Sequence, residues 1–157
     1  MCVIIDANLA AVIFAQAPDE DFLPVIDWLV EKDGRLVSGG KLTQELFKIG
    51  AARRFLRTLN QAGRAIRVPD GKVSKEETWV ISTGLCQSDD QHIIALARIS
   101  GARTLCSRDG NLHQDFKNQK LISNPRGAVY QKAEHAHLLQ HTPSCRSYRS
   151  KHQSRQK

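Results

Sequence analysis

The sequence lacks the features that mark several large classes of protein. Aromatic residues make up 6% of its 157 residues, and it contains a single methionine. No apolar run approaches the roughly 20 residues that cross a bilayer, so we expect no membrane partner. The chain starts directly with a strand-like run, and we therefore expect no signal peptide and a cytoplasmic location. Neither a G-x-G-x-x-G motif nor a P-loop is present, so no nucleotide cofactor is indicated.

Cysteine is also scarce, and no two cysteines form a C-x-x-C pair. Because free cysteine behaves as a small hydrophobe, we expect reduced thiols in or near the core at all four positions, Cys2, Cys86, Cys106 and Cys145. The last cysteine closes an H-x-H-x₃-H-x₃-C spacing that begins with His135, His137 and His141. This spacing is not a standard structural zinc pattern, so ordinary surface histidines are the favoured interpretation.

The excess of positive charge belongs to one end of the chain. The net charge is +7, but the last twelve residues hold five Arg or Lys and no acid, which leaves 18 basic against 16 acidic residues elsewhere. Segment 142–157 is rich in Ser, Gln and Arg and too polar to fold alone, so we expect a disordered tail after one folded domain of residues 1–141. This tail serves either as a solubilising end or as an arm that attracts phosphate backbones.

Short apolar runs alternate with stretches of helical periodicity. The runs predict strands at 2–5, 35–38, 65–68, 103–107 and 128–130. Helices are expected at 8–16, 19–32, 41–49, 51–62, from a capping box at Ser74 to about Ser82, and at 90–99, 112–116 and 134–140, with turns at 69–71 and 124–127. A second capping box, Ser88 with Gln91, precedes the helix at 90–99. The alternation indicates an α/β fold, a three-layer α/β/α domain with a central, mostly parallel sheet.

Four acidic residues lie where a predicted strand ends or on a helix that can face one. Asp6 closes the first strand, Glu45 lies in the helix at 41–49, Asp90 opens a helix, and Asp109 follows the strand at 103–107. Ligands of parallel α/β folds bind at the carboxyl ends of the strands. Several buried carboxylates repel one another unless a divalent cation neutralises them, so the arrangement favours a metal-dependent nuclease.

Three segments carrying these acids resemble the PIN-domain nucleases. They read Val-Ile-Ile-Asp-Ala-Asn around Asp6, Asp-Gln-His-Ile-Ile-Ala-Leu-Ala from Asp90, and Thr-Leu-Cys-Ser-Arg-Asp up to Asp109, and the match spans roughly residues 2–116. The resemblance implies an endoribonuclease that hydrolyses single-stranded RNA, with Asp6, Glu45, Asp90 and Asp109 as catalytic residues around one or two Mg²⁺ or Mn²⁺ ions. The residue types suit that role, because carboxylates are hard ligands and a bound ion activates water for in-line attack on phosphorus.

Several neighbours of these acids have two interpretations. Asp89 is either an outer metal ligand or a helix N-terminal charge. Asn111 either binds metal through water or completes a turn, and Asn8 either hydrogen-bonds a ligand carboxylate or caps a helix. Ser107 can hydrogen-bond the acid that follows it, and His92 is expected to be a core or hydrogen-bonded residue.

Basic residues accompany the acids. Arg53, Arg54 and Arg57, with Lys48, share one helix face near Glu45, which is either a solvated face or a track for the RNA backbone. Arg108 either points at phosphate or is an exposed turn residue.

The resemblance also implies partners: RNA, a second copy of the chain, and an antitoxin protein if the chain is the toxin of a toxin–antitoxin pair. A defence nuclease and a housekeeping enzyme fit the sequence equally. The main alternative is a non-catalytic RNA-binding or adaptor module with the same fold. A receiver-type phosphoacceptor domain is less favoured, because no adjacent acidic pair precedes the first helix and no lysine follows the last strand convincingly.

Overall fold

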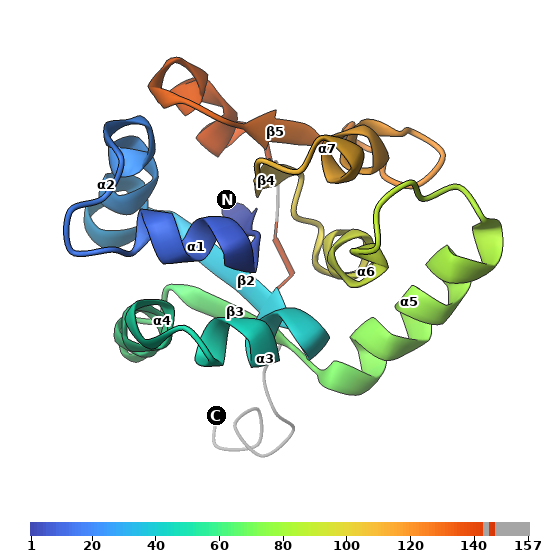
Figure 1. Ribbon diagram of the computed structural model, residues 1–157, viewed down its shortest axis with the longest axis horizontal. Coiled ribbons are helices and arrows are strands. Elements are labelled where there is room, and N and C mark those ends of the chain that lie inside the picture. Colours follow the sequence, from blue (N-terminus) through green and yellow to red (C-terminus); the bar gives the residue numbers. More distant parts are fainter. Residues whose placement is uncertain (143–144, 147–157) are drawn as a thin grey trace.

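The computed structural model, which describes residues 1–142 and 145–146, is built around one sheet of five parallel strands (Figure 1). The strand order is β3-β2-β1-β4-β5, and every pairing is parallel. The strands are β1 (Cys2–Ile5), β2 (Arg35–Gly39), β3 (Ala65–Val68), β4 (Thr104–Cys106) and β5 (Ala128–Tyr130). The predicted α/β fold with a parallel sheet is confirmed, and the strand predicted at 128–130 lies at one end of the strand order.

Helices cover both faces of the sheet. Right-handed crossovers place the helices of the β1–β2–β3 connections opposite those of the β3–β4–β5 connections, because the two series cross the sheet in opposite directions. Figure 1 shows α1, α2 and α4 on the left and α5, α6 and α7 on the right. The helices are α1 (Ala7–Ile13), α2 (Leu23–Glu31), α3 (Gly40–Phe47), α4 (Gly50–Gln61), α5 (Asp70–Thr83), α6 (Gln91–Ser100) and α7 (Gly110–Lys117), with 3₁₀ segments η1 (Glu20–Phe22) and η2 (Ala133–Gln140).

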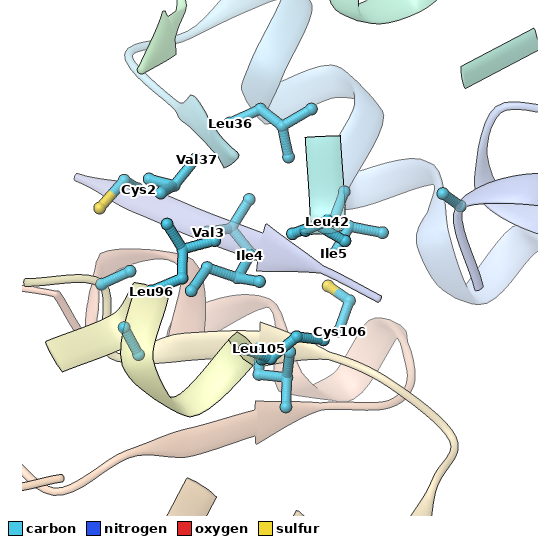
Figure 2. Close-up of a cluster of buried hydrophobic side chains, with 14 of the residues drawn as sticks. Cys2, Val3, Ile4, Ile5, Leu36, Val37, Leu42, Leu96, Leu105 and Cys106 are labelled. Carbon is cyan, nitrogen blue, oxygen red and sulfur yellow. The ribbon is translucent and has the colours of Figure 1, made fainter. Parts of the chain in front are cut away.

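The core is centred on β1, which is buried along its whole length (Figure 2). The neighbouring strands β2, apart from its first residue Arg35, and β4 are also buried, and α3 and α6 contribute Leu42 and Leu96. Continuous apolar strands of this kind are typical of a parallel sheet covered on both faces. Within residues 1–142 and 145–146, no helix combines the length and the apolar character needed to span a bilayer.

Two predicted helix boundaries are wrong. Helix α5 begins at Asp70, so the predicted turn at 69–71 is part of its start, and Ser74 lies inside the helix rather than capping it. The reason is tertiary: Oδ1 of Asp70 accepts the backbone N–H of Gly40 at 3.0 Å, which fixes the first turn of α5 against α3. The predicted helix at 19–32 is divided into η1 and α2, and Asp19 caps η1.

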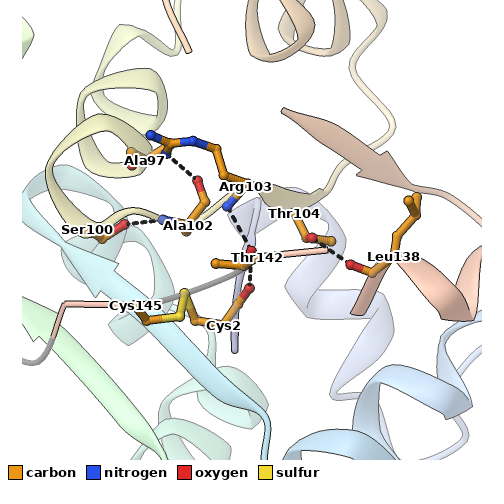
Figure 3. Close-up of a disulfide and its surroundings, with 9 residues drawn as sticks. All are labelled: Cys2, Ala97, Ser100, Ala102, Arg103, Thr104, Leu138, Thr142 and Cys145. Carbon is orange, nitrogen blue, oxygen red and sulfur yellow. Dashed lines mark hydrogen bonds between the residues drawn. A yellow bond between two sulfur atoms is a disulfide. The ribbon is translucent and has the colours of Figure 1, made fainter. Parts of the chain in front are cut away.

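The C-terminal segment packs against the start of the sheet (Figure 3). Cys145 forms a disulfide with Cys2, 143 positions away, so the expectation of reduced thiols is wrong for this pair, whereas Cys86 and Cys106 are free. Thr142 is buried, and its Oγ1 donates to the carbonyl of Cys2 at 3.2 Å and accepts the backbone N–H of Arg103 at 3.0 Å. The predicted tail thus contributes contacts at its beginning, and residues 143–144 and 147–157 lie outside the described residues.

Candidate functional site

Two of the predicted acids line one cavity at the carboxyl edge of the sheet. Asp6 directly follows β1, and its backbone N–H donates to the carbonyl of Cys106 at the end of β4. Asp109 follows β4 and is the N-cap of α7. The cavity has a volume of about 280 Å³ and is lined by Asp6, Asn8, Leu9, Val12, Arg108 and Asp109. Parallel strands that end side by side therefore bring together carboxylates 103 positions apart in the sequence.

Ser107 joins these two acids. Its Oγ donates to Oδ2 of Asp6 at 3.1 Å and accepts the backbone N–H of Asp109 at 3.0 Å. The carboxylate of Asp109 accepts the backbone N–H groups of Asn111 and Leu112, as an N-cap does. The sequence predicted that Ser107 hydrogen-bonds the carboxylate of Asp109, whereas in the structure its hydroxyl donates to the carboxylate of Asp6 and meets Asp109 only at the backbone N–H. Asn111 completes the turn through its backbone, and no described contact tests its role as a metal ligand.

Asn8 lies inside α1 and is therefore not a helix cap. The backbone of Asn8 lowers the pKa of the Asp6 carboxyl, and so does the hydrogen bond from Ser107. Burial outweighs both effects. Asp6 is only 6% exposed, and its pKa lies above the ordinary value of 3.8, chiefly because burial disfavours the charged form and also because Asp90 and Asp109 repel it.

Asp90 belongs to the same electrostatic cluster. It is the N-cap of α6, and its pKa is also raised, first by burial and then by the charges of Glu45, Asp109 and Asp89. His92 opposes this shift. Asp6, Asp90 and Asp109 thus interact electrostatically with one another, whereas Glu45 and the exposed Asp89 join the cluster through Asp90. Their catalytic and metal-binding roles stay predictions.

Glu45 faces a histidine that the sequence did not pair with it. Nε2 of the buried His92 lies 2.9 Å from Oε1 of Glu45, which is 44% exposed. The two atoms meet the distance of an ion pair but not the angle of a hydrogen bond, so Nε2 has no hydrogen-bond partner within the described part of the chain. His92 is the third residue of the D-x-x-I segment that begins at Asp90. Nothing in the sequence indicates that it lies beside Glu45.

The segment that leads to Asp90 is held by Asp115, a residue that sequence reasoning missed. Asp115 is 2% exposed, and its two carboxylate oxygens accept the backbone N–H groups of Gln87 at 2.8 Å and Ser88 at 2.9 Å. Oγ of Ser88 accepts the backbone N–H of Asp90 at 3.2 Å, so the predicted capping box of Ser88 with Gln91 is wrong. The sequence offered one sign of this role: Asp115 is next to Phe116, whose side chain is expected to be buried, on the same helix.

The predicted basic residues divide between two places. Arg108 lines the acidic cavity, where its Nη2 lies 3.2 Å from Oδ2 of Asp19 and its guanidinium stands 5.5 Å from the ring centre of Phe22. Arg53 and Arg57 line a separate cavity of about 450 Å³ beside β3. Arg54, between them in the sequence, does not line it. Contact of these four arginines with RNA stays a prediction.

The donor chemistry of the acidic cluster suits a hard divalent cation. Carboxylate oxygens are the ligands that Mg²⁺ and Mn²⁺ prefer, and a cation would relieve the repulsion that raises the pKa of Asp6 and Asp90. As the side chains stand, no three His, Cys, Asp or Glu residues of the described ranges are grouped closely enough to hold an ion. The acidic cluster therefore suits a divalent cation by the type of its donor atoms and by its charge.

No family model matches the sequence, and no curated protein matches it either. Two solved structures are similar to the chain. The PIN domain endonuclease Utp24 is 19% identical over 82% of this chain and 82% of its own, with a TM-score of 0.44. A chain from the structure of VapBC2 from Rickettsia felis, bound to a DNA fragment from their promoter, is 15% identical over 83% of this chain and 100% of its own, with a TM-score of 0.48. The first is a PIN domain, the family that the sequence resembles.

Proposed function

We propose that the chain is a metal-dependent endoribonuclease that hydrolyses phosphodiester bonds of single-stranded RNA. The observation that best supports this is the mutual repulsion at the carboxyl edge of the sheet. There Asp90 and Asp109 raise the pKa of Asp6, and Glu45 and Asp109 raise that of Asp90. Buried carboxylates that repel one another weaken a fold unless they serve a ligand, and a divalent cation is the ligand that suits them.

In this proposal Asp6, Asp90 and Asp109 hold the ion, and Glu45 lies at the margin of the cluster. A bound Mg²⁺ or Mn²⁺ supplies charge neutralisation and an activated water at neutral pH. The protein supplies position. Ser107 fixes the carboxylate of Asp6, and the backbone N–H groups at the start of α7 fix that of Asp109.

Substrate binding in this proposal depends on the nearby positive charge. Arg108 stands at the cavity that contains Asp6 and Asp109, where its guanidinium can meet a phosphate that displaces Asp19. Arg53, Arg54 and Arg57 extend this charge along α4 and would contact the backbone without choosing sequence. An antitoxin, a second copy of the chain and a cytoplasmic location stay predictions drawn from the sequence.

Incubation of the purified protein with a mixed pool of RNA tests the proposal. We expect fragments with Mn²⁺, none with EDTA, and none from the Asp6→Asn variant. That variant should fold at least as well as the wild type, because it removes a repelled charge.

The alternative function is an RNA-binding or adaptor module without catalysis. It is favoured by one observation, the absence of a ready-grouped set of three ligands among the described residues. Such a module would bind the RNA pool equally with Mn²⁺ and with EDTA, would leave it uncut, and would be indifferent to Asp6→Asn.

A further inference from the structure

The cavity of about 450 Å³ beside β3 contains none of the acids of the cleavage chemistry proposed above, although it is lined by Arg53 and Arg57 of the proposed RNA contact. Its floor comes from neighbouring strands, since Ser38 of β2 pairs in register with Arg67 of β3 and Ala65 lies two residues earlier on the same face. Thr43 and Phe47 line it from α3. Glu45 lies between these two in the sequence and therefore points to the other side of the helix. Helix α3, with a diameter of about 10 Å, thus separates this cavity from the acidic cluster.

The charge of the cavity selects an anion. Three arginines line it, Arg53, Arg57 and Arg67, and none of the described residues in its wall is acidic. Arg57 has no hydrogen-bond or ion-pair partner within the described part of the chain. Arg67 stands 3.8 Å from Asp70 in a solvent-exposed pair, a contact that an incoming anion replaces at little energetic expense. Nη1 of Arg53 donates to the carbonyl of Phe47, which leaves its other N–H groups free to bind.

The rest of the wall suits a flat apolar group rather than a phosphate alone. Phe47 is 42% exposed, and it lines the cavity together with Leu56. Aromatic faces beside arginines are surfaces on which nucleobases stack. Asn60 and Ser38 add both donors and acceptors, as the edge of a base requires. The volume also lies within the range of small-molecule sites.

We propose that this cavity binds one nucleotide, with its phosphate on Arg57 and Arg67 and its base against Phe47. The nucleotide is either free or one unit of a single-stranded RNA, since the chemistry recognised is the same. Binding depends on none of the acids of the cluster, so it can hold even if the proposed cleavage does not.

Titration calorimetry on the full chain, with EDTA present to prevent cleavage, tests this proposal. The ligands are AMP, GMP, CMP, UMP and inorganic phosphate, and a short labelled single-stranded RNA is followed separately by fluorescence anisotropy. We expect Phe47→Ala and Arg57→Gln to weaken nucleotide binding at least about fivefold each, the lower limit for losing a stacking or charged contact. Phe47→Tyr keeps the ring and should bind as the wild type does.

The matched control is Arg54→Gln. It makes the same change of charge on the same helix but outside the cavity, so it should alter the affinity for mononucleotides by less than about twofold through the screened long-range field alone. Thermal unfolding of each variant shows that it folds, as expected for side chains that are largely exposed.

Binding of a mononucleotide that is weakened by Phe47→Ala and Arg57→Gln but not by Arg54→Gln supports a site for free nucleotides. Binding of RNA alone, with the same dependence on Phe47 and Arg57, supports a site for one unit of a strand. The proposal is overturned if neither ligand depends on Phe47 and Arg57, if phosphate binds as tightly as every nucleotide, or if Arg54→Gln loses as much affinity for mononucleotides as Arg57→Gln.

Discussion

Breaking the disulfide between Cys2 and Cys145 should remove a large share of the stability of this fold. The bond joins residues 143 positions apart, so it closes nearly the whole chain into one loop. In the chain-entropy description, a loop of that length takes about 17 cal/mol/K from the unfolded chain, which is about 5 kcal/mol at room temperature. This value is an upper limit in practice, and it compares with a total of about 5–15 kcal/mol for a typical domain.

The contacts around the disulfide decide what remains after reduction. Thr142 keeps its hydrogen bonds to Cys2 and Arg103, and the backbone N–H of Arg146 donates to the carbonyl of Ser100 at 2.9 Å. We therefore expect reduction to lower the free energy of unfolding without changing the native secondary structure. The C-terminal segment should stay docked under native conditions.

Urea unfolding of the wild type, with and without reductant, measures the loss. Cys145→Ser should match the reduced wild type, and Cys86→Ser, which removes a free thiol, should not. A thiol count on the unfolded, unreduced protein should find the two free cysteines, Cys86 and Cys106. Four reactive thiols, or unfolding curves that coincide with and without reductant, would refute the reasoning. Because disulfides are rare in the cytosol, the count also bears on the expected location.

Three further changes have definite expected results. Thr43→Val should raise the free energy of unfolding by about 1–3 kcal/mol in urea, because the buried hydroxyl has no hydrogen-bond partner among the described residues. Asp115→Ala should lower it by about 2–5 kcal/mol and also slow RNA cleavage, because two backbone N–H groups before Asp90 lose their acceptor. Unfolding followed against pH should show the free energy of unfolding of the wild type falling as pH rises from about 4 through the raised pKa of Asp6. The reason is that the folded state binds the proton of the Asp6 carboxyl more tightly than the unfolded state does. Asp6→Asn should flatten this fall.

Much of the sheet and the placement of the acids could be predicted because both follow from local patterns. A continuous apolar run such as Cys2–Ile5 indicates a buried strand wherever it lies. Once the strands are parallel, the residues after them must meet at one edge, and this is how Asp6 and Asp109 come to line one cavity.

The missed features depend on contacts between distant positions. Cys2 gives no local sign of its disulfide partner, and Asp115 looks like any helix acid until the segment before Asp90 folds over it. Asp70 was predicted in a turn because Pro and Gly flank it. Its hydrogen bond to Gly40, 30 residues away, decides instead that a helix starts there.

Thermal unfolding with increasing Mn²⁺ tests the acidic cluster most directly, because it reports binding independently of any RNA. The wild type should be stabilised as Mn²⁺ rises, and Asp90→Asn should lose most of that gain. Asp33→Asn is the matched control. This exposed acid precedes β2, at the amino ends of the strands and away from the acidic cluster, so the variant should keep the full stabilisation by Mn²⁺. Equal stabilisation of the wild type and Asp90→Asn, or none in the wild type, would contradict a metal site built from these carboxylates.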